Sequence, residues 1–253
     1  MRLVAWNLMH GGNARRMPEI ALSLLDLKPD LAVLSEFRPA AGGQIAGVLA
    51  DHGLVHHIHN DPPRGVNGLL IASREPLREI PTSVPLGVGS NRRAERRLLE
   101  VETPSLVVVA VHVPPDAWRE SHTDTSARER VLARLLKIAR DRREQPCALI
   151  GDFNAARADA GGDSPTPTGA TALGQLATMG FVDAWRTHNP GVSEPTWVGP
   201  DGHGVRIDHA YLSSSLARRL AACQFSHAPR LSGHSDHSIL VVDLRHSQTA
   251  QST

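Results

Sequence analysis

The residues best suited to chemistry in this 253-residue sequence stand where apolar runs end. Such runs predict strands, and the end of a strand is where a rigid sheet can hold several side chains at one point. The set contains carboxylates, two asparagines and two histidines. Oxygen donors of this kind suit Mg²⁺ or Mn²⁺ held together with water and phosphate oxygens, while histidines suit proton transfer. The residues are Asn7, Glu36, His112, Asp152, Asn154, Asp208, Asp236 and His237.

Each of these residues, taken singly, has a purely structural explanation. A lone acidic residue after a strand is most often a solvated turn residue or a helix cap, and Gly151-Asp-Phe-Asn154 could form only an Asx turn. His112 could be a hydrogen-bonded histidine at the rim of a sheet. Six such places in one chain, each attached to a strong apolar run, favour a shared site over coincidence.

The elements that would position these side chains alternate between strands and helices. Short apolar runs bounded by turn residues predict strands over 3–6, 31–34, 68–72, 106–111, 148–150 and 239–244. Apolar residues at helical spacing predict helices over 18–27, 44–51, 125–143 and 170–179. Asp124 or Ser126 would cap the third helix. A strand-rich middle from 53 to 112 adds to this alternation, and together they predict an α/β protein with mixed sheets. No stretch resembles an interdomain linker, so we expect one domain over 1–246 and a short disordered tail over 247–253.

Composition argues against several classes of protein. The net charge of +1, from 27 basic and 26 acidic residues, disfavours a broadly cationic clamp on nucleic acid but allows a local basic strip. Cys147 and Cys223 make neither a disulfide framework nor a zinc motif. No apolar run approaches the roughly 18 residues that a membrane span needs, and the N-terminus lacks the pattern of a signal peptide. We therefore expect a soluble, cytoplasmic protein.

Three motifs in a fixed order carry the strongest resemblance of the sequence. They are Gly151-Asp-Phe-Asn154, Arg206-Ile-Asp208 and Ser235-Asp-His237. Together with Asn7 and Glu36 before them, they make the sequence similar to the endonuclease/exonuclease/phosphatase superfamily over nearly its whole length. That superfamily includes exonuclease III-type apurinic endonucleases, secreted deoxyribonucleases, tyrosyl-DNA phosphodiesterases, neutral sphingomyelinases and inositol polyphosphate phosphatases. The resemblance implies a four-layer α/β/β/α sandwich, in which outer helices cover two packed mixed β-sheets.

The resemblance also implies a metal site. Glu36 looks like the principal ligand of Mg²⁺ or Mn²⁺, with Asn7 beside it. Asp236 looks like a further ligand, which would act directly or through a water molecule.

The resemblance implies roles in catalysis for five further residues. Asp152 would orient or deprotonate the attacking water, and Asn154 would hydrogen-bond the reacting phosphate oxygens. His237 would contact the scissile phosphate, with Asp208 as the carboxylate that fixes its ring. Such a pair favours the imidazolium, which counters the charge that develops on phosphorus. His112 matches the phosphate-facing histidine of the deoxyribonuclease, sphingomyelinase and tyrosyl-DNA phosphodiesterase branches.

The sequence departs from the family pattern at two places. Apurinic endonucleases usually carry a tyrosine where His112 stands, and Tyr211, the only tyrosine of the chain, lies elsewhere. Thr196-Trp197 nevertheless follows the spacing of exonuclease III-like enzymes, so the mixture leaves the substrate open. The Asn-x-Asn-Gly form common after the first strand is replaced by Asn7-Leu-Met-His10. His10 either supplies a polar contact at the metal or sits in the turn.

Two other constellations suggest different chemistry. Ser235-Asp-His237 suggests a serine hydrolase, but adjacent side chains of an extended segment diverge, and the chain has no Gly-x-Ser-x-Gly elbow. His52, His56, His57 and His59 suggest a zinc site. Alternation along a strand would instead put His57 and His59 on one face and His56 on the other, as in a half-exposed strand.

The run Arg92-Arg-Ala-Glu-Arg-Arg97 is the best nucleic-acid candidate outside the central set. It either binds a phosphate backbone or forms a solvated edge whose charges deter aggregation. Trp118 and Trp197 could stack on bases, although packing is the commoner role of tryptophan. Four loops without a readable code would decide the choice of substrate, and they lie around 60–66, 84–94, 115–124 and 157–170.

The sequence therefore predicts a divalent-metal-dependent phosphodiester hydrolase, with a DNA nuclease that uses in-line attack of water as the leading interpretation. DNA would be its partner, with no membrane, no obligate protein partner and a monomeric state. The alternative is a phosphomonoesterase or a sphingomyelin-type phospholipid phosphodiesterase that uses the same site. A non-catalytic binding protein with this fold is a third hypothesis, and the presence of the whole residue set argues against it.

Overall fold

The computed structural model describes residues 1–11, 16–81, 96–115, 127–156 and 167–245. Several sequence-based interpretations fall outside these residues. They concern the tail over 247–253, the loops over 84–94 and 157–166, most of the loop over 115–124, the caps Asp124 and Ser126, Trp118, and Arg92–Glu95 of the basic run.

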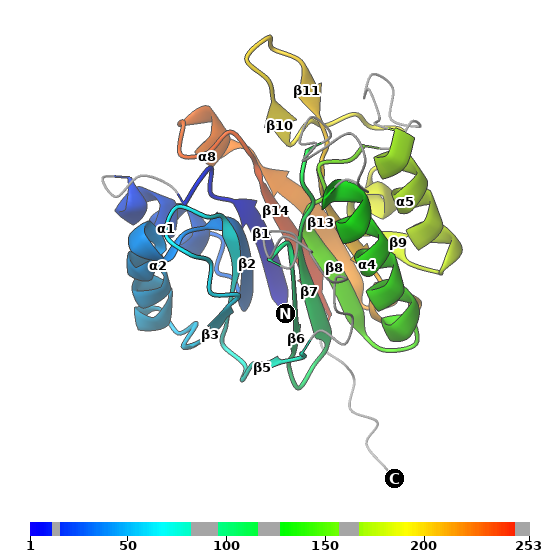
Figure 1. Ribbon diagram of the computed structural model, residues 1–253, viewed down its shortest axis with the longest axis horizontal. Coiled ribbons are helices and arrows are strands. Elements are labelled where there is room, and N and C mark those ends of the chain that lie inside the picture. Colours follow the sequence, from blue (N-terminus) through cyan, green and yellow to red (C-terminus); the bar gives the residue numbers. More distant parts are fainter. Residues whose placement is uncertain (12–15, 82–95, 116–126, 157–166, 246–253) are drawn as a thin grey trace.

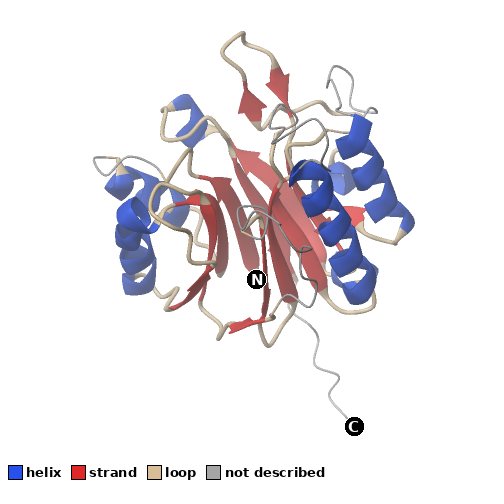
Figure 2. Cartoon of the chain, viewed as in Figure 1, coloured by secondary structure: helices blue, strands red, loops and turns tan. Residues whose placement is uncertain are grey.

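Two six-stranded mixed sheets pack face to face at the centre of the fold (Figures 1 and 2). The first sheet has the order β13-β14-β1-β2-β4-β3 and consists of β1 (Arg2–Asn7), β2 (Leu31–Phe37), β3 (His56–His59), β4 (Gly68–Ser73), β13 (Leu220–Ser226) and β14 (Ile239–Leu244). The second has the order β5-β6-β7-β8-β12-β9 and consists of β5 (Arg78–Glu79), β6 (Leu98–Glu102), β7 (Val107–His112), β8 (Cys147–Asp152), β9 (Val182–Asp183) and β12 (Asp208–Leu212). In each sheet one central pair is parallel, β1 with β2 and β7 with β8.

Helices cover the outer face of each sheet (Figure 2). The first sheet is covered by α1 (Met17–Leu25) and α2 (Pro39–Asp51), and the second by α4 (Ala127–Arg142) and α5 (Pro167–Thr178). Three apolar clusters result, one between the sheets and one under each helical layer. The expected α/β/β/α sandwich is therefore confirmed. Three short helices complete the described helices: α6 (Ala184–His188), α7 (Ser214–Ala217) and α8 (Ala228–Leu231).

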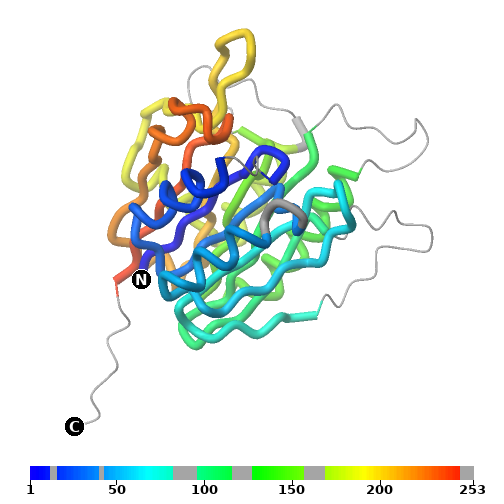
Figure 3. Tube along the Cα trace, turned by 90° about the vertical axis from the view of Figure 1, so that its left-hand side faces the viewer, coloured from blue at the N-terminus to red at the C-terminus, as the bar shows by residue number. Residues whose placement is uncertain are grey.

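A small hairpin stands apart from both sheets. It is formed by β10 (Trp197–Val198) and β11 (Gly204–Val205), and it projects from the body of the fold in both views (Figures 1 and 3). In the described part of the chain, no helix is long and apolar enough to cross a membrane.

The expected strands and helices are all present, with ends that differ by a few residues. The strand expected over 239–244 has the same bounds in the structure, whereas the helix expected over 44–51 begins earlier, at Pro39, because proline fits the first turn of a helix. The apolar runs of the sequence predict neither β12 nor β13. β12 escapes a search for such runs because Asp208 and His209 are polar although buried.

Candidate active site

The eight predicted site residues meet at one edge of the sandwich, where the two sheets approach each other. In the second sheet, the pairing of β7, β8 and β12 places His112, Asp152 and Asp208 side by side. Seven of the eight line one cleft of about 380 Å³, and the remaining one, Asp208, lies behind His237. The side chains on the cleft are Asn7, Glu36, His112, Asp152, Asn154, Asp236 and His237.

Three side-chain contacts cross from the first sheet, or the segment before β14, to the second. Asn7 Nδ2 donates to Asp152 Oδ2 at 3.0 Å. His237 Nδ1 lies 2.9 Å from Asp208 Oδ2, and Glu36 Oε1 lies 3.6 Å from His112 Nε2. The site therefore depends on how the two sheets are packed, because neither sheet holds it alone.

Asp152 is a buried carboxylate that two asparagines surround. Besides Asn7, it accepts the backbone N–H of Asn154 at 2.8 Å and the Asn154 amide at 3.1 Å. Burial raises its pKa to about 7, with Asp208 adding to the rise and His237, Asn154 and Asn7 opposing it. A carboxyl with a pKa near neutrality is suited to accept a proton from water.

In this structure the Asn154 amide donates to Asp152 and to the backbone. Its amide protons do not point into the cleft, where the expected contact with a phosphate would be. The two protons of Nδ2 are directed at the Val113 carbonyl oxygen, 2.8 Å away, and at Asp152 Oδ2. Its backbone has a φ of 45°, in the left-handed region that asparagine tolerates well. This turn brings its N–H back onto the Asp152 carboxylate.

His237 and Asp208 form a buried ion pair. Burial alone would lower the pKa of His237, but the charge and hydrogen bond of Asp208, together with Asp152 and Asp236, raise it to about 10. His237 is therefore an imidazolium at neutral pH, and its Nδ1–H donates to Asp208 Oδ2. The buried Thr196 hydroxyl supports the pair, because it accepts the backbone N–H of Asp208 at 3.2 Å.

Glu36 enters the cleft through an irregularity of β2. The register of the β2–β4 pair shifts between Ser35 and Phe37, and Glu36 there has a left-handed φ of 56°. Its Oε2 accepts the backbone N–H of His10 at 2.6 Å and lies 2.8 Å from His10 Nδ1. His10 sits in the turn after β1, with a φ of 60°, and its ring also contacts this carboxylate, so the two alternatives for that residue are not exclusive.

Glu36 and Asp236 have the character of cation ligands. In the part of the chain that the structure describes, neither forms an ion pair with lysine or arginine; Asp236 Oδ2 accepts the Trp197 indole N–H, at 3.0 Å. Partly buried carboxylates without a cationic partner favour a bound cation. The Asn7 oxygen accepts the N–H of Met9 and keeps a second lone pair. These donors fit a hard divalent ion.

A second group of side chains also has the close spacing of metal ligands. Among the described residues, one group of three acidic or histidine side chains has its ligand atoms within 4.8 Å of one another, and it consists of Asp152, Asp208 and His237. His237 is protonated at neutral pH, and its Nδ1 is already bonded to Asp208. An imidazolium does not ligate a metal, so this group suits contact with an anion.

Sequence reasoning missed the residues that support the site. Arg97 belongs to the basic run and contacts His112, while Arg128 of α4 donates to the carbonyl oxygens of Pro114 and Asn154 at 2.7 and 3.0 Å. Thr196 supports Asp208. Their roles depend on strand register and helix docking. The arginine run and the Thr196-Trp197 motif gave a signal in the sequence, but neither indicated these contacts.

The competing constellations have structural roles. Ser235 Oγ donates to the Asn7 carbonyl oxygen at 2.6 Å and accepts the N–H of His237, so it orders the backbone and is not aligned as a nucleophile on the imidazole. On β3, His57 and His59 are exposed and His56 is half-buried, which confirms the half-exposed strand. Trp197 lines the cleft and donates to Asp236.

Comparison with known proteins identifies the family to which the chain belongs. The profile of the endonuclease/exonuclease/phosphatase family matches residues 4–237. The chain belongs to this family. The expected resemblance is thereby confirmed over nearly the whole sequence.

Individual members of the family are distant in sequence and close in structure. The chain is 22% identical to exodeoxyribonuclease III of Haemophilus influenzae, over 87% of this chain and 90% of that protein. It superposes on the 3′-5′ exonuclease NExo from Neisseria meningitidis with a TM-score of 0.80 at 23% identity, over 97% of this chain and all of the other. An AP endonuclease from Archaeoglobus fulgidus gives 0.71 at 21% identity, over 96% of this chain and 99% of the other. These superpositions show that the fold is shared.

Proposed function

We propose that this protein is a divalent-metal-dependent phosphodiesterase that hydrolyses DNA by in-line attack of water. The observation that carries the proposal is the meeting, in one cleft, of a carboxyl with a pKa near 7, an imidazolium and a carboxylate that no described lysine or arginine neutralises; these are Asp152, His237 and Glu36. Phosphoester hydrolysis needs a proton acceptor for water, a positive group at the phosphate and a metal site.

Three residues would hold the ion in this proposal. Glu36 is the principal ligand of Mg²⁺ or Mn²⁺, with Asn7 and Asp236 beside it. When bound, such an ion supplies positive charge that polarises the phosphoryl oxygens and counters the charge of the transition state. The donor set, which consists of two carboxylates and an amide oxygen, supports a hard cation without distinguishing the two metals.

The remaining residues handle the water and the phosphate. Asp152 accepts the proton of the attacking water, with Asn7 and Asn154 orienting its two oxygens. His237 donates from Nε2 to a phosphoryl oxygen, because its Nδ1 proton is held by Asp208. His112 faces the same cleft and also contacts the phosphate. It lies on the β7 side of Asp152, whereas His237 and Asp208 lie on the β12 side.

DNA is the proposed substrate because the relatives named for their substrate act on it. Besides the exodeoxyribonuclease and the AP endonuclease, a 3′ phosphatase from Neisseria superposes with a TM-score of 0.78 at 22% identity, over 97% of this chain and all of the other, and its structure contains a product DNA hairpin. Every side chain of the proposed site comes from one chain, so we propose that the enzyme acts as a monomer and without an obligate protein partner.

The decisive experiment is cleavage of end-labelled strands in Mg²⁺ or Mn²⁺. The panel holds single-stranded, duplex, nicked and abasic DNA, DNA with a 3′-phosphate, and RNA. Glu36→Gln removes the charge of the proposed ligand. Glu102→Gln is the matched control. Glu102 pairs with Arg78 on β5, and β5 is the edge strand of the second sheet that lies farthest from β12 and β9.

We expect cleavage that EDTA abolishes, that Glu36→Gln reduces by at least about 100-fold, and that Glu102→Gln leaves near the wild-type rate. The lengths of the products separate internal from terminal attack. If the folded, metal-loaded protein cleaved no strand but hydrolysed inositol phosphates or sphingomyelin, DNA would be the wrong substrate and the phosphomonoesterase or phospholipid phosphodiesterase alternative would replace it.

A further inference from the structure

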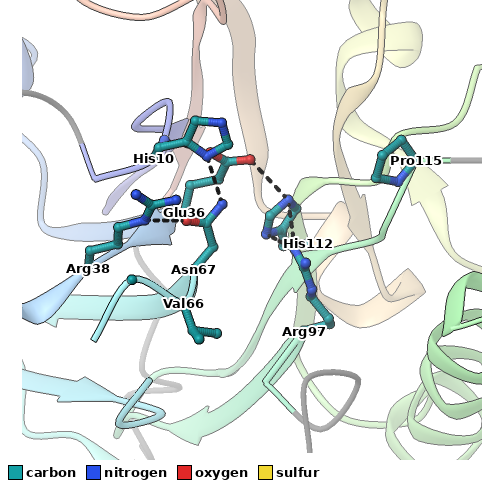
Figure 4. Close-up of a pocket in the computed structure, with 9 residues that line it drawn as sticks. His10, Glu36, Arg38, Val66, Asn67, Arg97, His112 and Pro115 are labelled. Carbon is teal, nitrogen blue, oxygen red and sulfur yellow. Dashed lines mark hydrogen bonds and ion pairs between the residues drawn. The ribbon is translucent and has the colours of Figure 1, made fainter. Parts of the chain in front are cut away.

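Arg97, just before β6, and His112, at the end of β7, are neighbours in a cavity that adjoins the cleft (Figure 4). The backbone N–H of His112 donates to the Arg97 carbonyl oxygen at 2.9 Å. Their side chains also meet, since Arg97 Nη1 lies 2.7 Å from His112 Nδ1 and 3.1 Å from Nε2. Both residues are buried, with Arg97 8% and His112 2% exposed. The contact is therefore shielded from water.

The chemistry of the two groups fixes which nitrogen of His112 carries the proton. A guanidinium only donates, whereas a neutral imidazole has one donor and one acceptor nitrogen. Nδ1 is the nitrogen closer to Arg97 Nη1, at 2.7 Å against 3.1 Å for Nε2, so it is the one placed to accept. Nε2 lies 3.6 Å from Glu36 Oε1 and 3.9 Å from Asp152 Oδ2, and both of these oxygens accept. The shorter distance from Arg97 to Nδ1 and the two carboxylate oxygens near Nε2 thus favour a proton on Nε2.

We propose that Arg97 is a positioning residue that holds His112 as the Nε2–H tautomer, so that this N–H points into the cleft at a nonbridging oxygen of the scissile phosphate. The inference rests on the proposed phosphodiesterase function. It makes the two histidines of the site complementary. Asp208 accepts a hydrogen bond from Nδ1 of His237, whereas the Arg97 guanidinium donates to Nδ1 of His112.

A direct contact between Arg97 and DNA is the competing explanation. Arg97 also lines an adjoining cavity of about 310 Å³, together with Arg38, which donates to Asn67 through Nε at 2.6 Å. Two arginines in one cavity could hold a neighbouring phosphate of the strand. A positioning role predicts that the effect of Arg97 disappears without His112, while a phosphate contact predicts an effect that does not depend on His112.

The first test reads the tautomer itself and does not need activity. Long-range ¹H–¹⁵N correlation spectra of the Mg²⁺-saturated protein distinguish protonated from unprotonated ring nitrogens, and His112→Ala assigns the signal by its loss. We expect a protonated Nε2 and an unprotonated Nδ1, with a mixture of tautomers in Arg97→Met. A protonated Nδ1 in the wild-type protein would overturn the proposal. A protein that cleaved no DNA would contradict the proposed function, and the spectra would still decide the tautomer.

The second test is a double-mutant cycle on DNA cleavage. Arg97→Met lowers kcat roughly tenfold with KM within about twofold, and Arg97→Lys, which keeps a cationic donor, restores part of the loss. In the His112→Ala background, Arg97→Met changes kcat by less than about twofold, because the group through which it acts is gone. Arg142→Met, which removes a partly buried arginine from its ion pair with Glu100, controls for the loss of an arginine. Losses that multiply, or a loss confined to KM, would identify Arg97 as a phosphate contact and overturn the proposal.

Discussion

At the residue scale, the proposed chemistry centres on Asp152, whose carboxylate accepts three hydrogen bonds while burial raises its pKa to about 7. Asp152→Asn keeps the size of the side chain and removes the proton acceptor. We expect kcat to fall by about 100- to 10,000-fold with little change in KM, because general-base catalysis contributes on that order. Steady-state kinetics on the best DNA substrate measure both constants.

Circular dichroism and thermal unfolding of Asp152→Asn serve as the control for its folding. Asp243→Asn controls for the loss of a carboxylate away from the cleft, because Asp243 forms a half-exposed pair with Arg2. Asp183 does not serve this purpose, since it forms a buried ion pair with Arg206. Turnover near the wild-type rate in a folded Asp152→Asn protein would exclude Asp152 as the base.

The His237–Asp208 pair makes stability depend on pH. Because the pKa of His237 is raised from its ordinary 6.5 to about 10, the stability that its positive charge contributes is fully present below pH 6.5 and is lost as the pH rises through about 10. Asp208→Asn removes the charge chiefly responsible. We therefore expect the free energy of unfolding to fall less steeply over this pH range in Asp208→Asn than in the wild-type protein.

Urea unfolding of the metal-free proteins at several pH values measures this difference. The comparison of slopes cancels the groups that do not interact with Asp208. Asp152 does interact with it, since Asp208 helps to raise its pKa, so the same comparison is made in the Asp152→Asn background. Parallel stability curves for the two proteins would show that Asp208 does not hold the proton on His237.

At the element scale, Gly151 allows β8 to end beside β7. Its φ is +139°, and a Cβ built there would lie 2.2 Å from the Val111 carbonyl oxygen, a backbone atom that cannot move aside. The close approach places Asp152 opposite His112 in the parallel register. Gly151→Ala should therefore lower the free energy of unfolding by at least about 2 kcal/mol and reduce activity, because it strains the backbone and displaces Asp152.

Gly47→Ala supplies the matched control for this prediction. Gly47 lies in the exposed face of α2, with no described atom within 4 Å of an added Cβ, so the substitution should stabilise the fold by about 0.5–1 kcal/mol. Denaturant unfolding of both variants measures the two changes in the free energy of unfolding, which should have opposite signs. A Gly151→Ala protein as stable as the wild type would refute the close approach of the strands.

The strands also show which parts of the fold the sequence can predict and which it cannot. Apolar runs locate β1, β2, β7 and β8, and the polar residues at their ends identify the site, because a strand fixes where its last side chain lies. The left-handed turn at Glu36 and the contact of Arg97 with His112 leave no such trace, since they depend on a bulge and on strand register. β12 leaves none either, because its buried polar residues interrupt the apolar pattern that marks a strand.

At the scale of the whole molecule, the site joins the two sheets. The proposed metal ligands come from the first sheet and the segment before β14, namely Asn7, Glu36 and Asp236, whereas Asp152 and Asp208 belong to the second. Catalytic geometry thus follows from the packing of the large apolar core between the sheets. A family profile that matches residues 4–237 describes this arrangement, in which the site residues are distributed from β1 to the start of β14.

A bound cation should therefore stabilise the entire fold, because it binds ligands from separate segments that only the folded chain brings together. At an ion concentration of 100 times the Kd, the gain is about 2.7 kcal/mol, which for a chain of this size raises Tm by roughly 5–10 °C. Thermal unfolding in Mn²⁺ and in EDTA measures the shift. Glu102→Gln should retain it and Glu36→Gln should lose most of it. An equal shift in all three proteins would place the ion elsewhere and remove Glu36 from the metal site.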